Sequence, residues 1–428
     1  MASIFLSAGE ASGDHYGAEV MAELRLRLPE AGFFGLGGPA MAEAGLDRVV
    51  RAEDVAVMGV TEILRHVPRI VREYRRLVGA IRRRRPEAAV LIDFPDVNFR
   101  LAKQLKRMGV PVVWFVSPQL WAWKRRRLRW VQERVDRMMV IFPFEEGFYR
   151  ARGVAAEFVG HPLAGVVAGL AEAEERAVAM MDGSDREADP YGMTTKAQAP
   201  ALAWATTERA GGRGVVALLP GSRWKEVEAN LPEMLRAAEM LGPEFKYVLP
   251  VASTIDRGRL EAMLRRLNSS VKIALVEDAR AALAGARASV VASGTATVLA
   301  AVVGHPFVVV YRVSAMTFRM AKQMVRYPKE ILAERDERGV LPVAMVNLLA
   351  GRRVVPELIN EAFTAEWVAA AMRPLLGEGP EREAQMAGLR AVRNSLWPEG
   401  VDRARGTARV AEVVVELMEH DRVDGVRG

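Results

Sequence analysis

The alternation of short, largely apolar runs with longer segments of helical period is the feature that most constrains this fold. Within the runs the apolar residues are continuous, which is typical of strands buried on both faces of a sheet. The intervening segments are helical in period, and in Gly17–Leu28 the apolar residues share one stripe. This alternation predicts the α/β class, with doubly wound parallel sheets. The predicted strands are Ile4–Leu6, Ala88–Ile92, Val112–Val116, Met138–Ile141, Val215–Leu219, Lys246–Pro250, Lys272–Val276, Ser289–Ala292 and Phe307–Val310.

The predicted strands form two series, separated by a segment of different composition. Residues 169–212 are first Ala/Glu-rich and then polar, which indicates a linker with an inserted segment. A chain of 428 residues is expected to form two or three domains. We therefore predict Rossmann-like domains over 1–168 and 213–380, and a helical tail over 381–428.

Composition excludes several classes of chemistry. The sequence has no cysteine, which excludes disulfide scaffolds, thiolate catalysis and cysteine-ligated metals. Its five histidines are scattered and no Asp-x-Asp motif occurs, so we predict neither a metal site nor a cofactor. The net charge of +7 indicates an anionic partner instead.

The loop Ser7–Asp14 follows the first predicted strand and opens a helix. Its glycines permit a tight turn, and their spacing is not Gly-x-Gly-x-x-Gly, which argues against a dinucleotide cofactor. Glu10 lies where the ligand cleft of such folds is found, which makes its carboxylate a candidate functional group. The alternative is a turn in which Ser12 or Asp14 caps the helix.

Asp93 follows the strand Ala88–Ile92 and would also lie at the cleft edge of the sheet. A carboxylate there is a reasonable general base if a substrate hydroxyl lies within hydrogen-bond reach. The alternative, which the local sequence leaves open, is that Asp93 or Asp96 only caps the helix that follows.

Two loops of the second series have the character of phosphate-binding turns. In Leu219–Val227 a glycine lets the backbone approach a ligand, and Arg223 supplies a guanidinium suited to phosphate oxygens. Ala292–Thr297 places small polar residues at a helix N-terminus, which favours anions. Together the two loops indicate a diphosphate ligand.

Two basic stretches lie in the first series. Arg65–Arg85 mixes aliphatic residues with nine arginines, and Trp121–Trp130 places tryptophans beside lysine and arginine. Solvated helix faces, an anionic membrane surface and nucleic acid all fit this charge. No nucleic-acid module accompanies it, so we predict a membrane contact and no nucleic-acid partner. The first residues lack a basic region and the apolar stretch Ser289–Tyr311 is interrupted, which predicts no signal peptide and no membrane span.

Eight motifs, in order between about residues 4 and 375, resemble those of the lipid-A-disaccharide synthases. They are Ser7–Asp14, Ile92–Asn98, Val116–Trp123, Phe142–Glu145, Val159–Pro162, Leu218–Arg223, Ala292–Thr295 and Val346–Arg352. The resemblance implies an inverting, metal-independent GT-B glycosyltransferase of lipid A biosynthesis, with a cleft between two Rossmann-like domains. It implies UDP-2,3-diacylglucosamine and 2,3-diacylglucosamine 1-phosphate (lipid X) as substrates, and a β-1,6 disaccharide 1-phosphate and UDP as products. It also implies a cytoplasmic protein that is peripheral on the inner membrane.

The resemblance also implies roles for individual residues. Asp93 would be the base that takes the proton of the acceptor 6-hydroxyl, and Glu10 would be a second catalytic residue of the cleft. Substrate contacts would come from Ser12, Gly13, Asn98, Gln119, Gly221, Ser222, Arg223, Ser293, Gly294, Thr295 and Asn347. The basic stretches predict membrane contacts by Ile63, Leu64, Val67, Arg69, Arg72, Trp121, Trp123 and Arg125.

Leu299 departs from the family pattern, which has a glutamate five residues after the Gly-Thr pair begins. A leucine cannot accept the ribose hydrogen bonds that an acid makes there, which bears on donor affinity. Two alternatives stay open: another GT-B UDP-sugar enzyme, such as a 2-epimerase or a different transferase, and a catalytically silent lipid-binding protein. Since relatives of this fold exchange C-terminal segments between subunits, the tail after Glu381 leaves a monomer and a homodimer both open.

Overall fold

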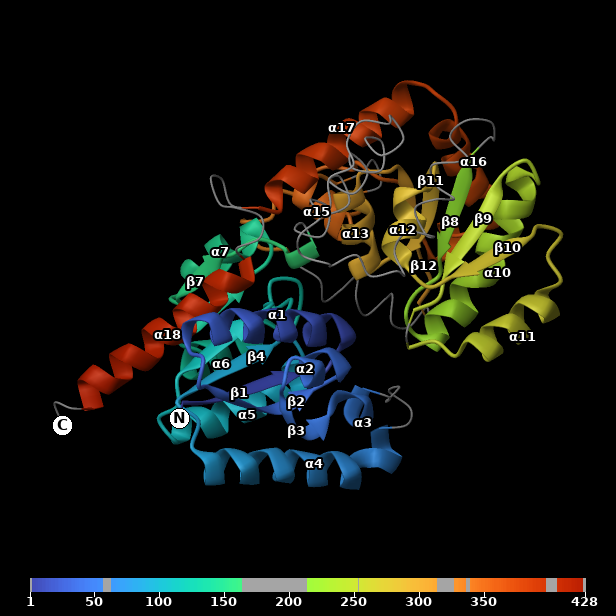
Figure 1. Ribbon diagram of the computed structural model, residues 1–428. Coiled ribbons are helices and arrows are strands. Elements are labelled where there is room, and N and C mark those ends of the chain that lie inside the picture. The colour runs from blue at the N-terminus through green and yellow to red at the C-terminus, as the bar shows by residue number, and fades with distance from the viewer. Residues whose placement is uncertain are drawn as a thin grey trace, which may run out of the picture. The chain divides into compact units, whose positions relative to one another are not determined.

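Two compact units make up the chain in the computed structural model (Figure 1). The first comprises Met1–Gly165, Val325–Glu330 and Leu396–Gly428, and the second comprises Val166–Met324 and Ile331–Ser395. The structure describes residues 2–56, 63–163, 214–252, 254–313, 327–335, 339–397 and 406–425. The linker predicted over 169–212 lies outside the described residues.

The first unit is built on a parallel seven-stranded sheet with the order β3-β2-β1-β4-β5-β6-β7. The strands are β1 (Ser3–Ala8), β2 (Gly32–Gly37), β3 (Asp47–Arg51), β4 (Ala88–Ile92), β5 (Val112–Phe115), β6 (Arg137–Val140) and β7 (Ala156–Phe158). The helices are α1 (Ala11–Arg27), α2 (Pro39–Glu43), α3 (Ala52–Ala56), α4 (Ile63–Arg84), α5 (Pro95–Arg107), η1 (Arg125–Arg127), α6 (Leu128–Arg134), α7 (Pro143–Arg150) and α18 (Gly406–Gly425). The strand order reverses between β1 and β4, which is where open α/β sheets bind ligands.

The second unit repeats this plan with a parallel six-stranded sheet in the order β10-β9-β8-β11-β12-β13. The strands are β8 (Val215–Leu219), β9 (Lys246–Pro250), β10 (Ile273–Val276), β11 (Ala288–Ala292), β12 (Phe307–Tyr311) and β13 (Glu357–Ile359). The helices are α10 (Trp224–Leu241), α11 (Arg257–Leu267), α12 (Ala279–Ala284), α13 (Thr295–Val303), α15 (Met345–Ala350), η2 (Asn360–Ala362), α16 (Ala365–Leu376) and α17 (Pro380–Ser395). Its reversal point lies between β8 and β11.

The structure confirms the α/β class, and each predicted apolar run coincides with a strand to within two residues. The sequence did not reveal β2, β3, β7 and β13. In β2 the sequence Gly-Phe-Phe-Gly-Leu-Gly looks like a loop, but one glycine is needed for packing. A Cβ on Gly35 would lie 1.9 Å from the Leu6 carbonyl oxygen on β1, so only glycine lets the two strands approach.

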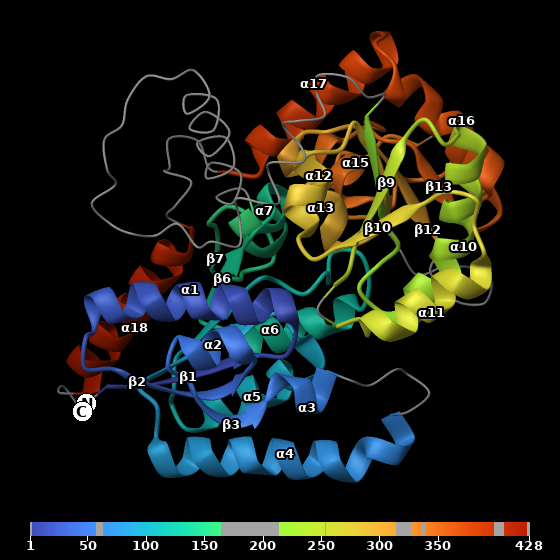
Figure 2. The same ribbon diagram turned by 45° about the vertical axis from the view of Figure 1, so that its right-hand side comes forward.

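The two helices of the predicted tail pack on different units. α17 packs against α13 and α15 of the second unit, whereas α18 lies beside α1 in the first (Figure 1 and Figure 2). Arg409 on α18 forms a 2.7 Å ion pair with Glu157 at β7, and Arg27 on α1 reaches Glu412 at 3.1 Å. The last described helix is therefore part of the layer that covers the first sheet.

Candidate functional site

The loops after β1 and β4 meet at the reversal point of the first sheet. A Cβ on Gly9 would lie 2.4 to 2.6 Å from ring atoms of Phe94, so the ring occupies the space that a side chain at position 9 would fill. One helical turn into α1, a Cβ on Gly13 would be in ordinary contact with Ile92 at 3.4 Å. Gly9 thus lets the chain after β4 pack directly against the first loop.

Asn98, on α5, forms hydrogen bonds to both of these loops. Its side chain is fully buried, and its amide nitrogen donates to the carbonyl oxygens of Asp93 at 2.8 Å, Ile92 at 3.2 Å and Ser7 at 3.3 Å. Its amide oxygen accepts the Ser7 hydroxyl at 2.7 Å. Since these bonds use both ends of the amide, Asn98 positions the loops, and the substrate contact by Asn98 stays a prediction.

Asp93 occupies a strained turn at the end of β4. Asp93 and Phe94 have φ angles of 44° and 47°, a left-handed conformation that costs a non-glycine residue on the order of 1 kcal/mol or more. The N–H of Asp93 donates to the Phe115 carbonyl on β5 at 3.0 Å, and its side chain is half-buried. Val116, at the end of β5, is also left-handed with φ 63°, which is unusual for a β-branched residue. Strain of this kind concentrates at functional sites.

The remaining polar residues of the first loop divide into exposed and structural ones. Glu10 is exposed at the N-cap of α1, where its side chain makes no capping bond, and Ser12 is half-buried. Asp14 does not cap its own helix. Its carboxylate accepts the N–H groups of Gly38 at 2.7 Å, Ala40 at 2.9 Å and Met41 at 3.1 Å, and so caps α2.

A buried carboxylate, which the sequence did not single out, lies at the ends of β5 and β6. Glu145 is 1% exposed and accepts the Ser117 hydroxyl at 2.6 Å, the Trp121 indole N–H at 2.9 Å and the Phe142 N–H at 3.2 Å. Burial raises its pKa from 4.5 to about 7, although the Ser117 and Trp121 hydrogen bonds oppose this. Its only signal in the sequence was its place in the motif Phe142–Glu145.

Two further titratable groups are buried around this carboxylate. Tyr149 donates to the Pro118 carbonyl at 3.0 Å, and burial together with the charge of Glu145 raises the pKa of its phenol. His161 is 2% exposed, and burial lowers its pKa to about 3, so the imidazole is neutral. Gln119, for which a substrate contact was predicted, is exposed on the loop that follows β5.

In the second unit, the loop after β8 already holds a carboxylate at its helix N-terminus. The Glu226 Oε2 atom accepts the N–H groups of Ser222 at 3.2 Å and Arg223 at 3.3 Å. Gly221 has φ +127°, and a Cβ on it would lie 2.5 Å from the same oxygen. The Arg223 side chain is 71% exposed, with its guanidinium 3.6 Å from the Glu226 carboxylate.

The loop after β11 is more open. Gly294 has φ +152°, a Cβ on it would meet nothing within 4 Å, and both Gly294 and Thr295 are exposed, while Ser293 is half-buried. The first turn of α13 therefore presents its N–H groups at an accessible helix N-terminus. Leu299, one turn further along α13, packs against the apolar cluster that includes Val291 and Ala300.

Asn347 is another structural amide. It is fully buried, donates to the Val355 carbonyl at 2.9 Å and to Glu357 at 2.8 Å, and accepts the N–H groups of Val354 at 2.7 Å and Val355 at 3.0 Å. It fixes the turn before β13, and the substrate contact by Asn347 stays a prediction.

Of the predicted membrane residues that follow β5, one is buried and two are exposed. Trp121 is 2% exposed and its indole N–H donates to Glu145, so the indole is part of the core, and a membrane contact by Trp121 stays a prediction. Trp123 is 45% exposed beside Lys124, whose ammonium lies 4.2 Å from the ring centre, and Arg125 is exposed.

On α4 the apolar residues of the C-terminal half face the protein. Leu77 and Ile81 are buried, whereas Arg69 and Arg72 are exposed. The side chains of Ile63, Leu64 and Val67 lie outside what the structure describes. Across the described parts of the chain, no helix is long and apolar enough to cross a membrane, and no group of three or more acidic or histidine side chains could hold a metal.

Two parallel α/β units with loops of this kind define the GT-B class, which contains glycosyltransferases and UDP-sugar epimerases. The fold is similar to the Staphylococcus aureus MnaA–UDP co-structure (TM-score 0.60, 11% identity, 97% of this chain and 98% of that chain). It is also similar to a putative UDP-N-acetylglucosamine 2-epimerase from Listeria monocytogenes (TM-score 0.55, 10% identity, 98% and 97%).

The sequence comparisons narrow the class to one family. The profile of lipid-A-disaccharide synthetase matches residues 4–186 and 195–409. The lipid-A-disaccharide synthase of Acidobacterium capsulatum is 48% identical over 97% of this chain and 96% of its own length. That of Myxococcus xanthus is 40% identical over 98% of each. The chain belongs to the lipid-A-disaccharide synthase family of glycosyltransferases, as the motifs predicted.

Proposed function

We propose that this chain transfers a diacylglucosamine unit from UDP-2,3-diacylglucosamine to the 6-hydroxyl of 2,3-diacylglucosamine 1-phosphate. The products are the β-1,6-linked disaccharide 1-phosphate and UDP. Family membership over nearly the full length supports the reaction. The observation that carries the mechanism is the strained turn that places Asp93 at the reversal point of the first sheet.

In the proposed step, Asp93 accepts the proton of the acceptor 6-hydroxyl as that oxygen bonds to the anomeric carbon of the donor. The bond from the anomeric carbon to the UDP oxygen breaks, and the electron pair leaves with UDP, so the configuration inverts. Asn98 serves this step indirectly, because its bonds to the Ile92 and Asp93 carbonyls fix the turn. A base held in place needs little reorganisation as the proton moves.

The second unit supplies the proposed donor site. The accessible N-terminus of α13, at Ser293, Gly294 and Thr295, offers N–H groups to a diphosphate, and Arg223 adds a guanidinium. Glu226 occupies the N–H groups of the other loop, so we assign that loop's contribution to the Arg223 side chain. Glu10 is assigned to the acceptor side of the first unit, where it is exposed next to the Gly9–Phe94 contact.

We also propose that the protein works on the cytoplasmic face of the inner membrane without nucleic acid. The exposed Trp123 and Arg125 and the exposed arginines of α4 support a peripheral contact with an anionic surface. A homodimer stays a prediction.

The decisive experiment substitutes Asp93 by asparagine. Asparagine tolerates the left-handed conformation and keeps the shape of the side chain, but it cannot accept the proton. We expect kcat to fall by about 10²–10⁴-fold, with the affinity for UDP and the melting temperature nearly unchanged. Product formation and UDP release are measured together, with both acylated substrates present.

The matched control is Asp47→Asn, which removes an exposed carboxylate from β3 of the same unit. It should keep wild-type kcat. Near-normal kcat in Asp93→Asn would show that Asp93 only shapes the turn. Wild-type protein that epimerises a UDP-sugar, or that binds lipid without releasing UDP, would overturn the proposed reaction itself.

A further inference from the structure

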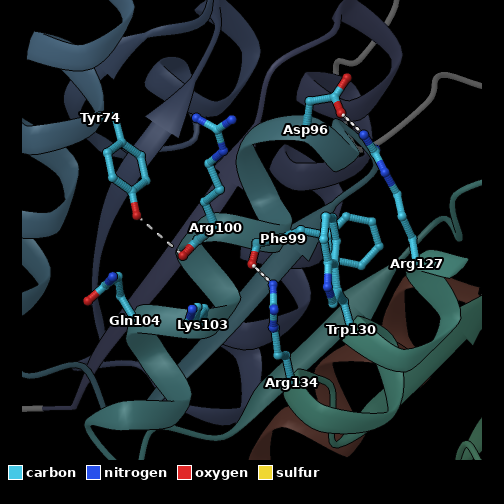
Figure 3. A pocket seen from close by; sticks show the side chains of 9 residues that line it. All are labelled: Tyr74, Asp96, Phe99, Arg100, Lys103, Gln104, Arg127, Trp130 and Arg134. Atoms are coloured by element: carbon cyan, nitrogen blue, oxygen red, sulfur yellow. Dashed lines mark hydrogen bonds and ion pairs between the residues drawn. The ribbon is translucent and has the colours of Figure 1, made fainter.

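A basic cavity in the first unit is lined by residues of α4, α5, η1 and α6. Its volume is about 310 Å³, and it lies over α5 (Figure 3). Tyr74 of α4 lies on one side of α5, and Arg127, Trp130 and Arg134 of η1 and α6 lie on the other. Arg127 and Trp130 belong to the basic stretch Trp121–Trp130, whereas Arg100, Lys103 and Arg134 lie outside both basic stretches.

The charge of the cavity lining is strongly unbalanced. Four cations line it, namely Arg100, Lys103, Arg127 and Arg134, against one carboxylate, Asp96. Asp96 forms a 2.7 Å ion pair with Arg127, which neutralises that guanidinium. Arg100 and Lys103 form no ion pair with any described residue. Two uncompensated cations one helical turn apart on α5 make a site for an anion.

Arg134 adds a partly desolvated guanidinium to the same cavity. It donates to the Phe99 carbonyl at 3.1 Å, and the nearest carboxylate oxygen paired with it, on Glu133, is 3.9 Å away. Burial lowers the pKa of Arg134, and the charge of Arg107 acts in the same direction. An anion in the cavity would relieve that repulsion.

One wall of the cavity is aromatic. The Trp130 ring packs edge-on against Phe99, with ring centres 5.5 Å apart, and the guanidinium carbons of Arg134 and Arg127 lie 4.9 and 5.5 Å from its centre. Trp130 is nevertheless 37% exposed. A wall that is apolar, aromatic and still partly open suits the organic part of a phosphate ester at a membrane interface.

The two unpaired cations of the cavity lie further along α5 than the turn at Asp93. At about 1.5 Å per residue, Arg100 and Lys103 lie about 7 and 12 Å along the axis from Pro95, where the helix starts after the Asp93 turn. A group bound by these two cations therefore lies beyond hydrogen-bond distance of the first residue of the helix.

We propose that this cavity binds the phosphate of an anionic phospholipid headgroup, with Arg100, Lys103 and Arg134 as its ligands and Trp130 against its glycerol. The site would hold the first unit on a lipid surface while the sugar transfer takes place at Asp93. It rests on the proposed function only in that the protein works at a membrane.

The test compares two double variants that remove the same charge. Arg100→Gln with Lys103→Gln empties the cavity of its free cations, and both residues are exposed, so the fold should be kept. The control, Arg265→Gln with Arg266→Gln, removes two exposed arginines from α11 of the second unit, outside the stretches proposed to contact the membrane. Binding is measured by co-sedimentation with phosphatidylglycerol vesicles and with phosphatidylcholine vesicles.

We expect the cavity variant to bind phosphatidylglycerol vesicles at least about 20-fold more weakly than wild type, and the control only a few-fold more weakly. Equal losses in the two variants would reduce the cavity to general surface charge and overturn the proposal. So would unchanged binding in the cavity variant. Release of UDP in detergent, measured on the same variants, should stay at the wild-type rate, so failure of this proposal is distinguishable from failure of the proposed reaction.

A second arm separates a lipid headgroup from free phosphate. Calorimetric titration with inorganic phosphate is run on wild type and on the cavity variant. Tight binding of inorganic phosphate that depends on Arg100 and Lys103, without any preference for phosphatidylglycerol vesicles, would assign the cavity to free phosphate and overturn the lipid assignment.

Discussion

Glu145 gives the structure a measurable dependence of stability on pH. Its pKa rises from 4.5 to about 7 in the folded protein, chiefly because the carboxyl is buried, and that difference corresponds to about 3 kcal/mol. Between these two values the folded protein holds a proton that the unfolded chain has released. The free energy of unfolding therefore falls as the pH rises from about 4.5 to about 7, and above about pH 7 this group lowers it no further.

The perturbation is Glu145→Gln, which is neutral at every pH. Its amide oxygen still accepts the hydrogen bonds from Ser117 and Trp121, whereas the amide nitrogen opposes the Phe142 N–H and adds a loss that does not depend on pH. The free energy of unfolding of the variant, relative to wild type, should rise by about 2–3 kcal/mol from about pH 5 to about pH 8.

The assay is urea unfolding followed by tryptophan fluorescence at several pH values, since Trp114 and Trp121 are buried in the first unit. Other titrating groups cancel in the difference between variant and wild type. Glu146→Gln is the control: it removes the neighbouring carboxylate, which is 30% exposed and paired with Arg150. An equal difference between wild type and Glu145→Gln at both ends of the pH range would refute the reasoning.

Four other substitutions test the site. Arg223→Ala should weaken UDP binding by about 10-fold or more in calorimetry, because it removes a charge-assisted contact, and should leave the melting temperature unchanged, because the side chain is exposed. Asn98→Ala should lower the free energy of unfolding by about 2–4 kcal/mol and also reduce kcat, because three carbonyls, two of them in buried hydrogen bonds, lose their donor; unchanged kcat would separate Asn98 from the turn at Asp93. Gly9→Ala should lower kcat by displacing Phe94, and Gly9→Ala with Phe94→Leu should recover part of it. Leu299→Glu should lower the melting temperature, since a carboxylate would be placed in an apolar cluster; tighter UDP binding at wild-type stability would show instead that the position faces the ribose.

The sheets could be predicted from the sequence, because strands buried on both faces leave continuous apolar runs. β2 could not, because the glycine that lets it approach β1 also makes it look like a loop. β7 and β13 have three residues each, which is too short for any periodicity to show.

The site was predicted less completely than the fold. Asp93 was found because a polar residue at a strand end has a positional meaning in doubly wound sheets. Asn98 and Asn347 have the residue type of ligand contacts, and only their buried hydrogen bonds reveal a structural role. The burial of Trp121 could not be predicted, because a tryptophan beside arginines has the composition of an interfacial residue and its hydrogen bond to Glu145 leaves no mark in the sequence.

The position of α18 has a consequence for synthesis on the ribosome. This helix packs on α1, and its buried residues, among them Val410, Val414 and Met418, complete the first unit. The residues from 166 to 395 are made in between, and at ordinary translation speeds that takes on the order of tens of seconds. During that time the face of α1 that α18 will cover is exposed, so the nascent first unit is a natural client for chaperones. A fragment that ends at Gly165 should accordingly be aggregation-prone, and adding the segment Gly406–Gly425 as a separate peptide should improve its solubility.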